Sequence, residues 1–167
     1  MTKQLSAERL RELLHYDHET GVFTRRVTVA HNAKAGDVAG CLHSDGCIVI
    51  RIDRRLYKAH GLAWLYMTGE VAAGDIDHKY GIRNDNRWSE LRPVSHGQNM
   101  QNQRRARVDN QVGMLGVSPS RGRWKAQIKV DGKNKFIGRF DTPEAAHTAY
   151  LEAKVRLHPF QTLVELA

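Results

Sequence analysis

The chain of 167 residues has a hydrophobic content of 41%, a mean hydropathy of −0.55 and a net charge of +8, which exclude a wholly disordered chain and fit one compact domain or two small ones. No apolar run approaches the roughly 20 residues that span a bilayer, and no apolar stretch follows the first five residues, so we expect neither a membrane segment nor a secretory signal. Two cysteines, Cys41 and Cys47, cannot form a disulfide framework and indicate reduced thiols of a cytoplasmic protein. A zinc site at these cysteines would need two further ligands.

The positive charge is concentrated in the last third of the chain. Residues 1–100 contain 14 Lys and Arg against 12 Asp and Glu, whereas residues 101–167 contain 12 against 6. Because neutralising phosphates releases counterions, such an excess favours a polyanionic partner.

The first part of the chain predicts a helix followed by short strands. Leucines at helical spacing, with Ser6 as the N-cap, predict a helix over residues 5–16. Alternating polarity predicts a strand at 22–25, and the β-branched run and turn residues of 47–60 predict a hairpin.

The middle of the chain predicts a buried helix and then a compact β-β-α unit. Residues 61–67 are apolar on most sides, which indicates a buried helix. Residues 76–78 predict a brief strand whose antiparallel partner is 91–94. Ser95 is a suitable N-cap for a helix from 96 to about 105.

Asp77 and His78 end the first strand of this unit, and Asn99 lies one turn into its helix. A β-β-α unit can bring a carboxylate and an amide oxygen to one point, and hard cations such as Mg²⁺ prefer oxygen ligands. A neighbouring imidazole can take a proton from an attacking water, while a metal stabilises the charge that develops on a phosphate. These groups can therefore support metal-dependent hydrolysis.

This stretch resembles the HNH endonuclease family, in particular its homing and phage members whose third residue is Asn. The resemblance lies within residues 46–102 and is carried by 60–64, 76–81, 84–94 and 98–99. It implies that His78 is the general base and that Asp77 and Asn99 hold one divalent metal. Mg²⁺ is the expected ion and Mn²⁺ the alternative. The resemblance also implies that the loop with Arg83 and Arg87 lies against the DNA backbone.

The chain departs from the family at Glu90, which stands where the family usually has an orienting Asn. An ionised Glu can accept a hydrogen bond but cannot donate an amide proton. We interpret Glu90 and His60 as supporting residues. The departure leaves open an alternative function, a DNA-binding protein with a degenerate, inactive HNH module.

The last third predicts a second small module. Strands are expected at 116–118, 123–130 and 135–140, and a helix is expected to begin near 141–144, where a capping residue precedes proline. The polar and basic residues 104–113 predict a linker before this module.

Residues 114–158 resemble the APETALA-two/ethylene-response-factor DNA-binding domain. The motifs that carry this resemblance are 116–118, 123–128, 136–140 and 142–146, with Tyr150. It implies a three-stranded sheet that is laid into the major groove and backed by a helix, where Arg can read guanine. Alternation places one set of side chains on the DNA face: Arg121, Arg123, Lys125, Gln127 and Lys129. It places another set on the helix face: Ile128, Val130, Phe136 and Phe140.

The two resemblances and the basic segments together give the expected DNA contacts. These are Arg83, Arg87, Arg104, Arg105, Arg107, Arg121, Arg123, Trp124, Lys125, Gln127, Lys129 and Arg139. For Trp124, packing on the sheet is favoured over contact with a base or sugar, and a solvated linker is the alternative for the arginines of 104–107.

The sequence therefore predicts an α+β chain, with an HNH module at 1–103 whose ββα-metal core spans about 74–103. A basic linker at 104–113 follows, and then a three-stranded antiparallel sheet packed on one helix at 114–167. The expected function is a phage- or homing-type DNA endonuclease that nicks double-stranded DNA in a bacterial or phage-infected cytoplasm. An RNA-binding or structural role is a further alternative. Monomer and dimer stay open, as do nicking and double-strand cleavage and the role of residues 1–45.

Overall fold

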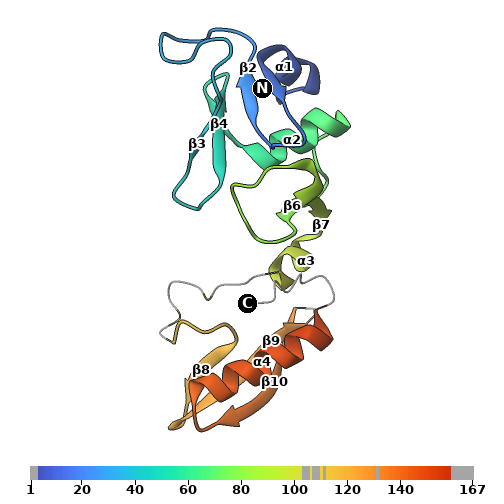
Figure 1. The fold of residues 1–167 in the computed structure, drawn as a ribbon. Helices are drawn as coiled ribbons and strands as arrows, with labels where there is room; N and C mark the ends of the chain where they lie inside the picture. The colour runs from blue at the N-terminus through green and yellow to red at the C-terminus, as the bar shows by residue number, and fades with distance from the viewer. Residues whose placement is uncertain (1–3, 103–105, 107–109, 111, 131, 159–167) are drawn as a thin grey trace. The chain divides into compact units, whose positions relative to one another are not determined.

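A computed structural model of the chain divides into two compact units, residues 1–94 and 95–167 (Figure 1). The structure describes residues 4–102, 106, 110, 112–130 and 132–158. Helices and small antiparallel sheets make up both units, in agreement with the expected α+β class. Over the described ranges, no helix is long and apolar enough to cross a membrane. Three of the expected DNA contacts lie outside the described residues, namely Arg104, Arg105 and Arg107.

Helix α1 (Ala7–Leu13) opens the first unit, and its start was predicted correctly. The Ser6 hydroxyl accepts a hydrogen bond from the Arg9 N–H at 3.2 Å, as an N-cap does. The helix ends earlier than expected, because the chain continues into strand β1 (Leu14–Tyr16), which pairs antiparallel with β2 (Phe23–Arg25). The outer two residues of β1 are buried and the middle one is exposed, which is the period of a strand.

The predicted hairpin is part of a three-stranded antiparallel sheet in the order β3 (Cys41–Leu42), β4 (Ile48–Ile52) and β5 (Arg55–Lys58). Residues 53 and 54 join β4 to β5 with φ values of 45° and 68°, the left-handed conformation of a two-residue hairpin turn. Both cysteines are free thiols: Cys41 in β3 is exposed, and Cys47 is buried.

Helix α2 (Ala59–Thr68) follows β5 directly and lies at the centre of the first unit's core. It ends at Gly69, which has the left-handed φ of 83° typical of a helix C-terminus. The core joins residues from every part of this unit, including the fully buried Leu10, Ile50 and Ala63. The N-terminal residues therefore complete the hydrophobic core around α2, which answers part of the question left open for residues 1–45.

Strand β6 (Asp75–His78) pairs antiparallel with β7 (Leu91–Val94), as predicted. The connection between them contains a short 3-10 helix, η1 (Trp88–Glu90), and passes beside the β3–β4 hairpin (Figure 1). This arrangement brings β6, which carries the expected site residues, into contact with α2.

Helix α3 (His96–Gln101) follows β7 and is shorter than the helix expected to reach about residue 105. Ser95 caps it as predicted, in a capping box with Gln98 in which each side chain binds the other's backbone N–H, at 2.8 and 3.2 Å. The order strand, strand, helix is confirmed along the chain. Since α3 falls in the second unit, the expected module boundary at residue 103 stays a prediction.

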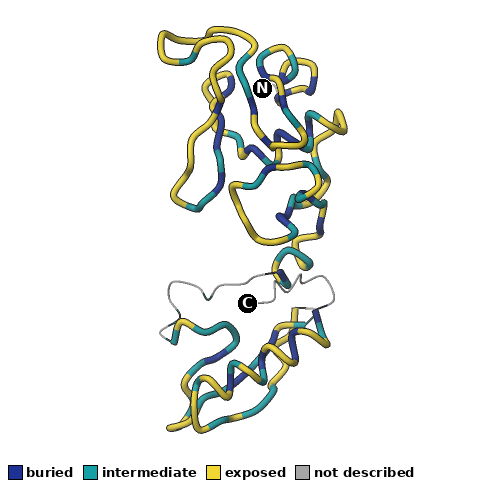
Figure 2. Tube along the Cα trace, in the orientation of Figure 1, coloured by how far each residue is buried: buried dark blue, intermediate teal, exposed yellow. Residues whose placement is uncertain are grey.

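The second unit contains the predicted three strands and one helix. The sheet has the order β10 (Lys133–Phe140), β9 (Arg123–Val130), β8 (Val117–Ser120), all antiparallel, and α4 (Pro143–Leu157) packs on it. Thr142 caps α4 by accepting the Ala145 N–H at 3.2 Å. Buried positions recur along one side of α4 (Figure 2), where they meet the sheet in a separate core.

The expected position of Phe136 on the helix face of this sheet is wrong. Phe136 lies opposite Gln127, on the outer face, and is 58% exposed. The pairing of β10 with β9 shifts register between Phe136 and Gly138. Before this bulge and after it, odd- and even-numbered side chains of β10 therefore point to opposite faces of the sheet. Phe140, beyond the shift, packs against the helix-side core as expected.

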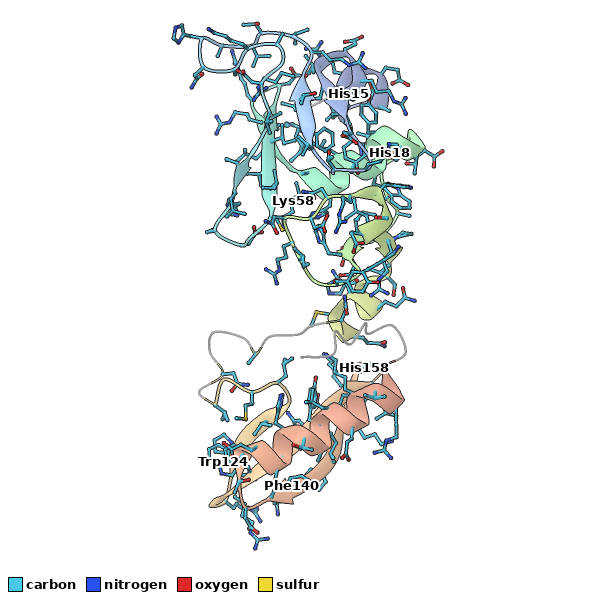
Figure 3. All side chains as sticks on the ribbon, in the orientation of Figure 1. His15, His18, Lys58, Trp124, Phe140 and His158 are labelled. Carbon is cyan, nitrogen blue, oxygen red and sulfur yellow. The ribbon has the colours of Figure 1, made fainter. Side chains whose placement is uncertain are left out.

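Two further residues among the expected DNA contacts lie away from the basic face. Arg121 lies with Gly122 in the turn between β8 and β9, with a φ of 52°, rather than on a strand. Trp124 is the cross-strand partner of Phe140, and both pack against the core beneath α4 (Figure 3). The structure therefore favours the packing alternative for Trp124.

Candidate active site

Asp77 and His78 lie at the end of β6 and are 9% and 7% exposed. The Asp77 carboxylate accepts two hydrogen bonds at Oδ2 from Arg92, from Nε at 3.0 Å and from Nη2 at 2.9 Å. Arg92 is the cross-strand partner of Asp77 on β7, so the β6–β7 pairing positions this ion pair. The guanidinium therefore fixes the orientation of the Asp77 side chain.

The His78 ring lies edge-to-face against the ring of His60, with centroids 4.9 Å apart. Burial lowers the pKa of His78, and the nearby side chain of Asn86 opposes part of this lowering. Because the pKa lies below the ordinary value, the His78 imidazole is neutral at pH 7. A neutral imidazole can accept a proton, so His78 has the protonation state that a general base requires.

His60 lies in the first turn of α2 and supports His78 by packing. Burial lowers the pKa of His60 to about 4, with further lowering from the neighbouring His78 and Lys58. A neutral His60 adds no positive charge beside His78. Its ring packs against the His78 ring, and its supporting role in the reaction stays a prediction.

The β6–β7 connection folds back over His78 through backbone hydrogen bonds. The Gly81 N–H donates to the His78 carbonyl at 2.9 Å, and the Lys79 N–H donates to the Glu90 carbonyl at 2.9 Å. The backbone carbonyl of Glu90 therefore joins the two ends of the β6–β7 connection. Asn86, within the same connection, is only 4% exposed.

The two arginines of this connection make contacts within the chain. Arg83 donates from Nη1 to the Asp45 carbonyl at 2.8 Å, at the tip of the β3–β4 hairpin. Arg87 pairs with Asp85, with Nε and Nη2 at 2.9 and 2.5 Å from its two carboxylate oxygens. Both arginines are exposed, and their contact with DNA phosphates stays a prediction.

Asn99 lies in α3, in the second unit, where its backbone N–H donates to the Ser95 carbonyl at 2.9 Å. Within the described part of the chain, no three His, Cys, Asp or Glu side chains group together as a metal site. A metal site formed by the Asp77 carboxylate and the Asn99 amide oxygen would not be a group of this kind, because Asn is not one of these residue types. This pair stays a prediction.

The outer face of the second unit's sheet is basic. Arg123, Lys125, Gln127 and Lys129 share this face of β9, as predicted from their alternation. Arg139 lies opposite Lys125 and adds a further positive charge. Within the described residues, Arg123 has an acidic partner, Asp141, at 3.1 Å, and both side chains are largely exposed. Such an exposed pair contributes little and leaves the face positive.

Comparison with known proteins concerns the segment that carries Asp77 and His78. Residues 57–101 match the HNH endonuclease family model. The match runs from the end of β5 through α3 and includes His60, Asp77, His78 and Asn99. No curated protein and no solved structure matches the chain.

The HNH match confirms the first resemblance in its coarse form and indicates a nuclease, a hydrolase whose expected substrate is DNA. HNH nucleases generally use a divalent metal. The match does not extend to the sheet of the second unit, so the resemblance to the APETALA-two domain stays a prediction.

Sequence reasoning missed two residues that the structure places at this site. Asn86 was inside the segment that carries the family resemblance, but its burial next to His78 had no separate signal. Tyr16 contacts Asn86 from the N-terminal part of the chain, and no motif marked it.

Proposed function

We propose that the chain is a metal-dependent DNA endonuclease in which His78 activates the attacking water. The observation that carries this proposal is the buried imidazole of His78, with a lowered pKa, beside Asp77 at the end of a strand in the HNH segment. We further propose that the enzyme nicks duplex DNA, because one such centre cleaves one strand at a time.

Each residue of the site has a defined part in this reaction. His78 accepts a proton from water at a ring nitrogen, while the packed ring of His60 restricts its orientation. Arg92 holds the Asp77 carboxylate in place. The carboxylate of Asp77 and the amide oxygen of Asn99 are the donor types that a hard divalent cation takes. Such an ion, when bound, stabilises negative charge on the phosphate and on the leaving oxygen.

The sheet of the second unit is proposed to bind the duplex. Its basic outer face suits a phosphate backbone, and a short antiparallel sheet fits the major groove. Binding through this face would hold the substrate while the first unit cleaves it.

The decisive experiment is incubation of the protein with supercoiled plasmid in Mg²⁺ or Mn²⁺, with EDTA as the control. We expect the supercoiled form to convert to open circles in the presence of either metal, and no conversion in EDTA. Linear product that appears without open circles would instead indicate two centres acting together. A protein that leaves the plasmid supercoiled under all conditions, while folded, contradicts the proposed activity.

A second prediction concerns DNA binding by the sheet. We expect the double variant Lys125→Gln, Lys129→Gln to lower the slope of log affinity against log salt by about 2, because each phosphate contact contributes about 0.9. The matched control is the double variant Lys133→Gln, Lys135→Gln, which removes the same number of charges at positions of β10 opposite Val130 and Ile128. Fluorescence anisotropy with a labelled duplex over a salt series measures both. An equal salt slope in the wild type and the Lys125→Gln, Lys129→Gln variant rules out binding through this face.

Glu90 supports a second candidate function, DNA binding without cleavage. The family's usual Asn is absent there, so the loop has lost an amide donor. Duplex binding by a wild-type protein that does not nick would favour this alternative, and recovery of nicking in Glu90→Asn would attribute the inactivity to this residue.

A further inference from the structure

The N-terminal hairpin of the first unit contacts the connection that covers His78. The Tyr16 hydroxyl, at the end of β1, donates a buried hydrogen bond of 2.6 Å to the Asn86 carbonyl. The Trp88 N–H donates to the carbonyl of His18 at 3.0 Å (Figure 3 labels His18). Two hydrogen bonds therefore join residues 16–18 to residues 86–88, although the family match begins only at residue 57.

Between these residues the two backbones approach very closely at Gly21. A Cβ atom placed on Gly21 would lie 2.4 Å from the Arg87 nitrogen and 2.4 Å from the Asn86 carbonyl carbon. Gly21 also has a φ of 74°, which disfavours other residues. The backbone of the turn at 17–22 therefore packs directly against the backbone of Asn86 and Arg87, between the two hydrogen bonds.

Asn86 belongs to the β6–β7 connection, which begins at His78, so fixing its backbone restrains this connection. Asn86 is 4% exposed, and its Nδ2 donates to the Asn84 carbonyl at 3.2 Å. The contacts run from Tyr16 to the backbone of Asn86, and the connection that contains Asn86 is hydrogen-bonded to the His78 carbonyl through the Gly81 N–H. A shift of Asn86 would thus change the environment of His78 without any change in the residues that touch substrate.

The ring and the hydroxyl of Tyr16 have separable roles. The ring stacks on Phe23 with centroids 4.7 Å apart and meets Tyr66 edge-on at 5.7 Å, so the ring belongs to the core. The hydroxyl makes the bond to Asn86. A phenylalanine at position 16 would keep the packing and remove this bond alone.

We propose that Tyr16, together with the turn at 17–22, is a positioning element of the active site that holds the β6–β7 connection in place beside His78. The N-terminal hairpin is then part of the catalytic module and not an addition to it. This inference rests on the proposed nuclease function, because positioning matters only if His78 reacts.

The test compares Tyr16→Phe with Tyr66→Phe, which removes a hydroxyl from the same aromatic cluster but leaves the bond to Asn86 intact. We expect Tyr16→Phe to lower kcat for plasmid nicking about tenfold at unchanged KM, because small misplacements of reacting groups are costly. We expect Tyr66→Phe to keep the wild-type kcat.

Amide hydrogen exchange measures the anchoring in the absence of substrate. In Tyr16→Phe the Trp88 amide, which is bonded to the His18 carbonyl, should exchange about tenfold faster, as expected when one buried hydrogen bond is lost. The amide of the fully buried Ile50 reports global unfolding and should be unchanged. Loss of protection at Trp88 alone separates local release from a general loss of stability.

The outcomes distinguish the two proposals. If the wild type nicks DNA and Tyr16→Phe matches Tyr66→Phe in kcat, the positioning role is overturned while the nuclease stands. If kcat falls only in proportion to faster exchange at Ile50, the effect is on folding and the positioning role is again overturned. A wild type that nicks nothing overturns the proposed function and the positioning role with it.

Discussion

Replacing His78 with alanine is expected to lower kcat for plasmid nicking by about 10³-fold, because a positioned general base typically contributes 10²- to 10⁴-fold. The lowered pKa of His78 keeps its imidazole neutral near pH 7, so the wild type has the base in its active form. Binding of duplex DNA should be nearly unchanged, since the proposed DNA face belongs to the sheet of the second unit. The measurement is the single-turnover rate of open-circle formation in Mg²⁺ at saturating enzyme.

Two controls make this result specific to the imidazole. His15→Ala removes a histidine that is exposed in the middle of β1, and it should nick at the wild-type rate. His78→Asn keeps a polar side chain in the buried position and should fail as His78→Ala does, which excludes a simple cavity effect. Wild-type rates in both His78 variants, with intact thermal unfolding, would assign the reaction to another residue.

The position of Asp77 and His78 at the end of β6 could be predicted from the sequence because the signal was local. Asp77, His78 and the cap Ser95 stand at fixed spacings around strand-like segments, and short-range pattern determines such elements. The Tyr16 contact could not be found in this way. Its partner Asn86 is 70 residues away, and only packing of the whole first unit brings them together.

Elements were misplaced where two local patterns were compatible with the same residues. Leu13 and Leu14 fit a helical period, yet pairing with β2 takes Leu14 into a strand. Phe136 was assigned to the helix side by simple alternation, but a register shift in the pairing with β9 turns it outward. In both places the partner strand determines the conformation, and the local sequence does not predict this pairing.

Gly116→Ala is expected to destabilise the second unit by about 3 kcal/mol, the combined size of a left-handed non-glycine residue and an overpacked core. Gly116 has a φ of 73°, and a Cβ there would lie 2.0 to 2.5 Å from three carbons of the Tyr150 ring. Tyr150 is 7% exposed in the core beneath α4, so its ring has little room to move. Urea unfolding followed by the NMR methyl signals of Ile128 and Ile50 measures the two units separately.

Gly122→Ala is the matched control, because it separates steric overlap from backbone strain. Gly122 has a similar φ of 75° but no heavy atom within 4 Å of the added Cβ. Its substitution should cost only the backbone term, about 1 kcal/mol. The Ile50 signal should unfold at the wild-type urea concentration in both variants if the two units are independently stable. Equal effects of the two substitutions would mean that Tyr150 yields to the new methyl group, and that the tight contact at Gly116 does not determine the stability of this unit.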